Sequence, residues 1–255
     1  MPAGASVYGL WLDRKGRVIG DSHVIRGPLD GEFWIVSTDS AGSAIAGHLQ
    51  AHIIADEVEV SDESPGWRAM ALVGEGCGEW LTSAVRPGFA FPGRRAPGEN
   101  WEWLFPEADA PAALAASSQG RAVATDEIER LRIRSAIASV PADIGPADLP
   151  NEGGLDAQAI SYSKGCYTGQ EVMARVKSLG RVRRTLVRVR GEGAPPALPA
   201  ALWRGERRDG ELRSAVADPG GFDGLALVSV DCAALGGGLS LAKGGPQTVS
   251  LVPAP

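Results

Sequence analysis

The sequence predicts an α+β protein with two domains, a mixed region over residues 1–190 and a small β-barrel over 191–255. In the first region, β-rich runs and a run with helical spacing follow one another in the order strand, helix, strand. After a Gly- and Pro-rich segment at 191–199, short β-like runs are separated by glycine turns, which is typical of small barrels and sandwiches. The length of 255 residues is sufficient for both domains.

The first region opens with a predicted hairpin, because two β-rich runs flank a turn that contains Gly16. The two strands of this hairpin are predicted at 7–12 and 17–19. Further strands of the first region are predicted at 33–36, 58–60 and 68–73. Apolar side chains at helical spacing predict a helix over 40–53. The glycines at 74–78 do not have the spacing of a dinucleotide-binding loop, which favours a simple turn from a strand into a helix.

The remainder of the chain supplies another strand, another helix and the barrel. Trp101, Trp103 and Phe105 alternate, which predicts a half-buried strand. Residues 126–137 have helical spacing, and the prolines that follow them predict a loop leading into a central motif. The barrel strands are predicted at 211–216, 225–230 and 248–252.

The composition is that of an ordinary globular protein, with 44% apolar and 22% charged residues. No apolar run approaches the roughly 20 residues that cross a bilayer, and no leader pattern is visible, so a cytoplasmic location without membrane partners is expected. The three cysteines are too scattered for a disulfide framework or a metal knuckle. His48 and His52 lack the glutamate of an HExxH motif, and no metal site is predicted.

The net charge of −6 is unevenly distributed along the chain. Between residues 164 and 190, eight basic side chains oppose only Glu171, a local charge of +7 that leaves −13 for the remainder. The basic residues are Lys164, Arg175, Lys177, Arg181, Arg183, Arg184, Arg188 and Arg190. Such a stripe attracts a polycarboxylate or a phosphate backbone, although a solvated strand face would have the same composition.

The central motif, K-G-C-Y-T-G-Q-E at 164–171, combines a thiol with two glycines. Gly165 and Gly169 leave the backbone on either side of Cys166 open to a ligand and permit unusual backbone angles. Lys164 would favour the thiolate form of Cys166 if the two side chains converged. A glycine turn that caps a helix and buries an unreactive cysteine is an equally good interpretation of these residues alone.

The second half of the motif offers groups that suit a planar heterocycle. Gln170 provides a hydrogen-bond donor and an acceptor, and Glu171 provides two acceptors, which together match the amide-like edge of a pterin ring. Tyr167 supplies an aromatic face. From Glu171 onward a helix is predicted, and Arg175, one turn later, is suited to an ion pair with Glu171.

The motif resembles the signature of the YgfZ family of folate-binding proteins, which are related to the glycine-cleavage T-protein and include mitochondrial iron–sulfur assembly factors. The resemblance continues through V-M-A-R at 172–175 and G-R-V-R-R-T-L at 180–186. It extends upstream to the pairs Arg132-Ile133 and Asp143-Ile144 and to L-P-N-E at 149–152. The early hairpin at 10–17 and the turn at 210–214 are similar as well, so that most of the chain is covered.

This resemblance implies a T-protein-like ring of α/β modules with a C-terminal β-barrel, and tetrahydrofolate as the cofactor. It implies that the partners are iron–sulfur proteins or their assembly machinery, whose assembly, repair or maintenance the protein would assist, without classical turnover of its own. Cys166 is then the main functional residue, as a thiolate or persulfide carrier or a cluster contact, with Lys164 beside it. The folate contacts would come from Gly165, Tyr167, Gly169, Gln170, Glu171, Arg175, Glu152, Asp143 and Arg184.

Two departures from the family pattern bear on function. The resemblance implies that the chain begins after the family's first strand and helix, which in the T-protein supply an aspartate needed for aminomethyl transfer. Arg134, Ala136 and Ala138 replace the Glu, Gly and Pro common in T-proteins. An aminomethyltransferase is therefore a weaker alternative, as is an RNA- or tRNA-associated factor, since Tyr167 is the only aromatic residue in the basic stripe. A polyglutamylated folate could use the same stripe.

Overall fold

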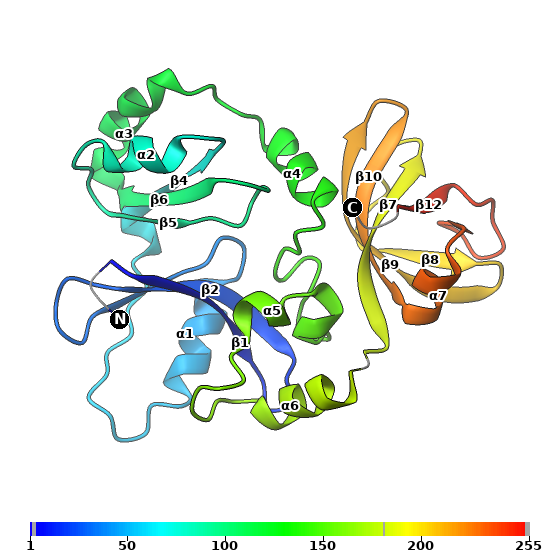
Figure 1. The fold of residues 1–255 in the computed structure, drawn as a ribbon, viewed down its shortest axis with the longest axis horizontal. Helices are drawn as coiled ribbons and strands as arrows, with labels where there is room; N and C mark the ends of the chain where they lie inside the picture. Colours follow the sequence, from blue (N-terminus) through cyan, green and yellow to red (C-terminus); the bar gives the residue numbers. More distant parts are fainter. Residues whose placement is uncertain (2–3, 181, 253–255) are drawn as a thin grey trace. The chain divides into compact units, whose positions relative to one another are not determined.

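The computed structural model describes residues 1, 4–180 and 182–252. The chain divides into two compact units. The first comprises Met1–Tyr8 and Ser22–Leu131, and the second comprises Gly9–Asp21 and the chain from Arg132 onward. Figure 1 shows the helices and strands of both.

The first unit contains two three-stranded sheets and small helices. One sheet has the order β1 (Ser6–Leu12), β2 (Val18–Arg26), β3 (Phe33–Val36), and the far ends of β1 and β2 continue into the second unit. The other sheet is antiparallel, with the order β4 (Trp67–Val73), β6 (Asn100–Pro106), β5 (Phe89–Pro92). The helices are α1 (Gly42–Gln50), α2 (Cys77–Thr82), α3 (Ala110–Ala116) and the start of α4 (Thr125–Arg134).

Strand β6 lies between two apolar clusters. Trp103 and Phe105 pack with Leu81 of α2 and Ala113 of α3. Leu104 instead packs with Ile25 and Phe91. The aromatic alternation predicted a half-buried strand, but successive residues of β6 are buried because this strand is central in its sheet and has cover on both faces.

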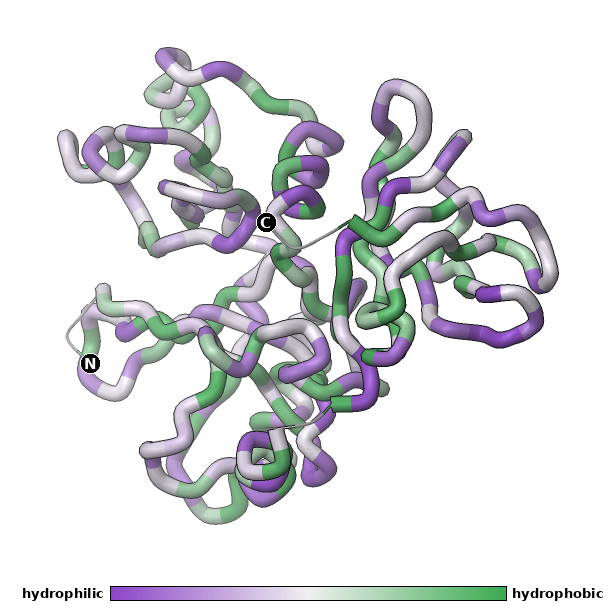
Figure 2. The backbone as a smooth tube through the Cα atoms, turned by 45° about the vertical axis from the view of Figure 1, so that its right-hand side comes forward, coloured by the Kyte–Doolittle hydropathy of each residue, from purple (hydrophilic) through white to green (hydrophobic). Residues whose placement is uncertain are grey.

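The second unit is built around a six-stranded antiparallel sheet that curls into a nearly closed barrel. Its strands are β7 (Arg184–Glu192), β8 (Ala200–Arg204), β9 (Arg207–Asp218), β10 (Gly221–Ser229), β11 (Gly238–Leu239) and β12 (Val249–Val252), in the order β11-β12-β7-β10-β9-β8. The two outer strands meet at Trp203 and Ser240, whose backbone N–H groups donate to each other's carbonyl oxygens at 2.9 and 2.8 Å. Figure 2 shows how hydrophobic and hydrophilic residues are distributed along the backbone.

The barrel begins earlier than the Gly- and Pro-rich segment suggested. Strand β7 starts at Arg184, pairs with β10 through its whole length and pairs with β12 over residues 188–191. Val187 and Val189 belong to the apolar barrel core, whereas the arginines at 184, 188 and 190 alternate with them on the outer side. Composition placed the domain boundary at 190/191. In the structure, the second compact unit already includes the chain from Arg132 onward.

Several sequence predictions are confirmed: the hairpin β1–β2, strands β3 and β4, helix α1 and the barrel. The strand predicted at 58–60 is wrong, since these residues have no regular structure. Helix α4 ends at Arg134, before the predicted 137, because Ala136 adopts a positive φ of 53° that terminates the helical path.

Candidate functional site

Cys166 lies on a surface loop that precedes helix α6 (Gln170–Leu179). Its thiol is exposed, as are Lys164 and Gly165, whereas Tyr167 and Gln170 are partly buried. The chain reaches this loop through a short 3-10 turn, Pro150–Gly153, and helix α5 (Asp156–Ala159). The sequence could not decide between an exposed and a buried cysteine, and the structure presents the thiol to solvent.

Two tyrosines form the underside of the loop and two lysines lie over their rings. The ammonium of Lys164 is 5.0 Å from the ring centre of Tyr167, and that of Lys177 is 3.9 Å from the ring centre of Tyr162. Both rings pack on the apolar core of the second unit, and both phenol oxygens are buried without a hydrogen-bond partner. Burial, and then the proximity of Tyr162, raise the pKa of Tyr167. The structure therefore gives Lys164 a cation–π contact.

Gly169 fixes the end of the loop against the hairpin turn of the same unit. It caps helix α6 with a φ of +83°, a conformation that favours glycine. A Cβ atom here would lie 2.8 Å from the carbonyl oxygen of Asp13 and 3.0 Å from Cα of Gly16. At Gly165, by contrast, an added Cβ would meet nothing within 4 Å. One glycine is thus required by packing, and the other leaves the backbone beside Cys166 open.

Glu171 and Arg175 form the ion pair that their spacing predicted. Arg175 Nη2 lies 3.5 Å from Glu171 Oε1, and both side chains are largely exposed, at 69% and 90%. An exposed pair of this kind contributes little to stability. Both side chains remain accessible to a ligand.

Asp143 is completely buried, and both of its carboxylate oxygens accept hydrogen bonds from the protein. Arg132 Nη1 donates to its Oδ2 at 2.6 Å, and the backbone N–H of Ser139 donates to the same oxygen at 2.9 Å. The hydroxyl of Ser214 on β9 donates to Oδ1 at 2.6 Å. Asp143 therefore joins the chain after α4 to the outside of the barrel.

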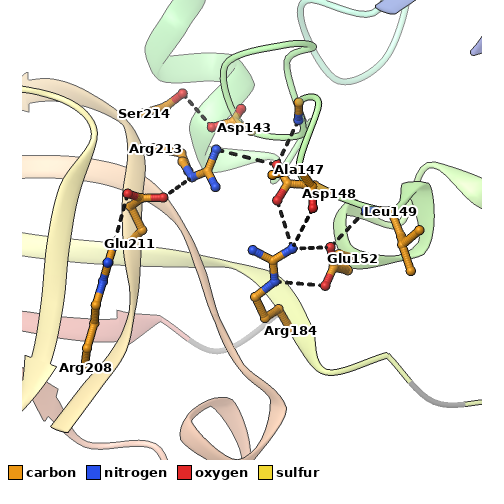
Figure 3. Close-up of polar contacts among 11 residues, drawn as sticks. Asp143, Ala147, Asp148, Leu149, Glu152, Arg184, Arg208, Glu211, Arg213 and Ser214 are labelled. Atoms are coloured by element: carbon orange, nitrogen blue, oxygen red, sulfur yellow. Dashed lines mark hydrogen bonds and ion pairs between the residues drawn. The ribbon is translucent and has the colours of Figure 1, made fainter. Parts of the chain in front are cut away.

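Arg184, at the start of β7, forms a second buried network (Figure 3). Its Nε donates to Glu152 Oε1 at 2.9 Å and its Nη2 donates to Oε2 at 2.7 Å, while Nη2 also reaches Asp148 Oδ1 at 2.9 Å. Arg213 of β9 approaches Asp148 from the other side at 3.5 Å. Burial lowers the pKa of Arg184, but the hydrogen bonds and charges of Glu152 and then Asp148 outweigh this and raise it.

The sequence grouped Asp143, Glu152 and Arg184 with the Cys166 loop as folate contacts. The structure brings Glu152 and Arg184 together and adds Asp148 and Arg213, which the sequence did not single out. No local pattern could have identified Arg213, because its contact depends on how β9 packs against a loop far away in the chain. In this conformation the polar groups of the three predicted residues are engaged within the protein.

The basic stripe is also smaller than the sequence count suggested. Arg190 pairs with Asp218 at 2.9 Å and lies 3.5 Å from Asp223, two acids that also bind Arg134. Among the residues that the structure describes, four members of the stripe form no ion pair: Lys164, Lys177, Arg183 and Arg188. Arg181 lies outside the described residues.

The glycines at 74–78 form a turn into helix α2, as predicted, and a side chain of the protein fills it. The carboxylate of Glu99 accepts hydrogen bonds from the backbone N–H groups of Gly76 and Gly78, both at 2.8 Å. These bonds lower the pKa of Glu99. The amides that a phosphate would need are therefore already occupied.

Within residues 1, 4–180 and 182–252, no group of three or more His, Cys, Asp or Glu side chains is arranged to hold a metal ion. The helices of this part of the chain are all too short or too polar to cross a membrane.

The three thiols differ in environment, which predicts an order of reactivity. Cys166 is exposed, whereas Cys232 is buried with the guanidinium of Arg204 3.3 Å from its sulfur. Cys77 is partly exposed, and burial and then the charge of Glu99 raise the pKa of its thiol. We expect alkylation of the native protein near neutral pH to modify Cys166 first and Cys232 only after unfolding. Peptide mapping against time measures this, and equally rapid labelling of Cys232 would contradict the structure.

No protein-family model matches the chain. It is 37% identical over 91 residues to the tRNA-modifying protein YgfZ of Vibrio vulnificus, a match that covers 35% of this chain and 26% of the relative. It is 25% identical over 216 residues to the mitochondrial iron–sulfur cluster assembly factor IBA57 homolog of Aspergillus clavatus, covering 71% and 46%. The matches thus span less than half the length of either relative.

Among solved structures, the chain is similar to the glycine cleavage system aminomethyltransferase T of Bartonella henselae. The TM-score is 0.78, and the match covers 98% of this chain and 75% of that one. At 18% identity this likeness establishes the fold and leaves the activity open. The α+β fold class with a C-terminal barrel is thereby confirmed. The chain is similar to YgfZ and to IBA57 over part of their lengths, and it has the fold of aminomethyltransferase T.

Proposed function

We propose that this protein is a tetrahydrofolate-binding accessory factor for iron–sulfur proteins, with the thiol of Cys166 as its reactive group. The observation that carries the proposal is the exposure of Cys166 on a loop whose end is fixed by Gly169. An exposed thiol on an ordered loop is suited to contact a cluster or a sulfur group on another protein. One relative is named for iron–sulfur cluster assembly, which supports this choice of client.

The same loop is the proposed edge of the folate site. Tyr167 and Gln170 are partly buried beside Cys166, and the open backbone at Gly165 leaves room for a planar ring to approach. Glu171 and Arg175 would lie at the solvent side, since both are largely exposed. Asp143, Glu152 and Arg184 would support the site from behind, because their hydrogen-bonding groups are engaged within the protein.

A polyglutamylated folate is the proposed natural form. Lys164 and Lys177 present ammonium groups at the surface without an ion pair among the described residues, and Arg183 is exposed nearby in sequence. These cations would attract the carboxylates of a glutamate tail, and the attraction would weaken as salt rises.

Genetic complementation tests the role of Cys166 directly. In cells that lack this protein, we expect the wild type and a Cys77→Ala control to restore the activity of iron–sulfur enzymes, whereas Cys166→Ala restores little. Cys77 is a suitable control because its thiol is less exposed and its pKa is raised. Full restoration by Cys166→Ala, with equal protein levels, would eliminate the thiol from the function.

A role in tRNA modification is the second candidate, because one relative is named a tRNA-modifying protein. Lys164, Lys177, Arg183 and Arg188 could neutralise phosphates, and such binding would fall steeply with salt concentration. Measuring modified nucleosides in the same complementation strains separates the two candidates. Loss of modification with intact iron–sulfur enzymes would favour a direct role on tRNA.

A further inference from the structure

The ion pair between Glu152 and Arg184 closes a loop of the chain that contains Cys166. Glu152 lies in the 3-10 turn just before this segment, and Arg184 is the first residue of β7 just after it. Their two hydrogen bonds, at 2.9 and 2.7 Å, thus join the entrance and the exit of residues 153–183. Figure 3 shows the guanidinium of Arg184 directed at this carboxylate.

The pair is anchored on both sides. The other oxygen contact of Arg184, Asp148, accepts a hydrogen bond from the backbone N–H of Gly145 at 2.9 Å and faces Arg213 of β9. The backbone N–H of Leu149 donates to Glu152 Oε2 at 2.9 Å, which fixes that carboxylate in turn. The side chains of Asp148 and Glu152 are only 0% and 5% exposed, so neither acid is free to move with solvent.

The segment between the two ends is attached to the core of the second unit mainly through Leu155 and Met173, which are 1% and 0% exposed. Residues 163–166 are exposed, and in helix α6 Met173 is the one fully buried side chain. The two phenol oxygens beneath the loop have no hydrogen-bond partner. The exposed stretch 163–166 buries little surface of its own, so its order depends on how the ends of the segment and these two apolar anchors are held.

We propose that the contacts of Arg184 with Glu152 and Asp148 form a clasp that holds the Cys166 loop in place, and that Arg184 is a positioning residue for Cys166. Taking three charges out of water offsets much of the attraction between them, so a buried pair of this kind is poor evidence for a gain in stability. We expect the topological effect of the pair to be local, because it joins the two ends of residues 153–183 and so restricts this segment more than the barrel strands. Only the identity of Cys166 as the reactive group rests on the proposed function.

Hydrogen exchange of the ligand-free full chain tests the clasp. In Arg184→Met we expect amides of residues 160–176 to exchange at least about tenfold faster, which corresponds to about 1.4 kcal/mol in the opening equilibrium. Amides of β8, β9 and β10 should exchange at about their wild-type rates. The double variant Glu152→Gln/Arg184→Met avoids an unpaired buried glutamate and should show the same local effect if the single variant folds poorly.

Two further variants distinguish a clasp from a general loss of stability. Arg190→Met removes another arginine of β7 that pairs with acids. Asp218 and Asp223 keep Arg134 as a partner, and neither acid is near the Cys166 loop in sequence. It should leave exchange at 160–176 unchanged. Arg184→Lys keeps the charge without the forked geometry and should restore part of the protection.

Equal acceleration in the loop and the barrel, or no acceleration in the loop, would overturn the clasp. Because exchange is measured without folate, the outcome is independent of the proposed cofactor. A wild-type protein that binds no tetrahydrofolate would contradict the proposed function and leave the clasp standing.

Discussion

Asp143→Ala lowers the free energy of unfolding by about 3–5 kcal/mol, the usual cost of removing one partner from a buried ion pair. The substitution leaves the guanidinium of Arg132 without its carboxylate. Because Arg132 is only 7% exposed, water cannot fully replace this partner. It also leaves the hydroxyl of Ser214 and the backbone N–H of Ser139 without their acceptor. Urea denaturation, followed by tryptophan fluorescence, measures the loss.

The matched control is Glu171→Ala, which removes an acid whose ion pair with Arg175 is long and exposed. This change should hardly alter the denaturation midpoint, because exposed pairs contribute little and alanine is a good helix former. An Asp143→Ala protein as stable as the control would mean that the buried network around Asp143 is absent in solution.

Acid destabilises the protein through His23, which lies between the rings of Tyr8 and Phe91 in the first unit. Burial, and then the charge of Arg94, lower the pKa of His23 from 6.5 to about 4. The folded state therefore binds fewer protons than the unfolded state between these values, so stability falls as the pH falls from about 6.5 to about 4. The full shift corresponds to roughly 3 kcal/mol, an upper limit that partial exposure of the imidazole reduces.

His23→Phe tests this effect, since phenylalanine fills the same aromatic position without a titrating group. The difference in unfolding free energy between wild type and His23→Phe should change with pH inside this window and be constant above it. Measuring urea denaturation of both proteins from pH 3.5 to 7.5 gives the difference directly. Parallel curves across the whole range would show that His23 is not held neutral in the folded protein.

Local patterns identified most elements of the fold, because hairpins and amphipathic helices depend on neighbours in sequence. The hairpin β1–β2, strand β3 beside β2, and helix α1 are of this kind. Strand β7 was missed as the first barrel strand because arginines at 184, 188 and 190 mask its inward Val187 and Val189. Arg184 and Arg190 find their acidic partners only through tertiary packing, and no sequence period predicts such pairs.

The candidate site was predicted to a similar degree. The motif around Cys166 and the pair of Glu171 with Arg175 were visible because they are local. The environment of Lys164 was not, since its contact with the ring of Tyr167 depends on the path of the loop. The clasp of Glu152 and Arg184 joins residues separated by the whole motif, so sequence could name both residues but not their mutual contact.

Calorimetric titration with tetrahydrofolate tests the central claim most directly. The full chain and its Cys166→Ala variant are each titrated with the monoglutamate and a polyglutamate form, at low and high salt. The proposal predicts saturable micromolar binding to both proteins, with the polyglutamate bound more tightly at low salt because Lys164 and Lys177 attract its carboxylates. Absence of binding by folded wild-type protein would contradict the claim that this chain binds tetrahydrofolate.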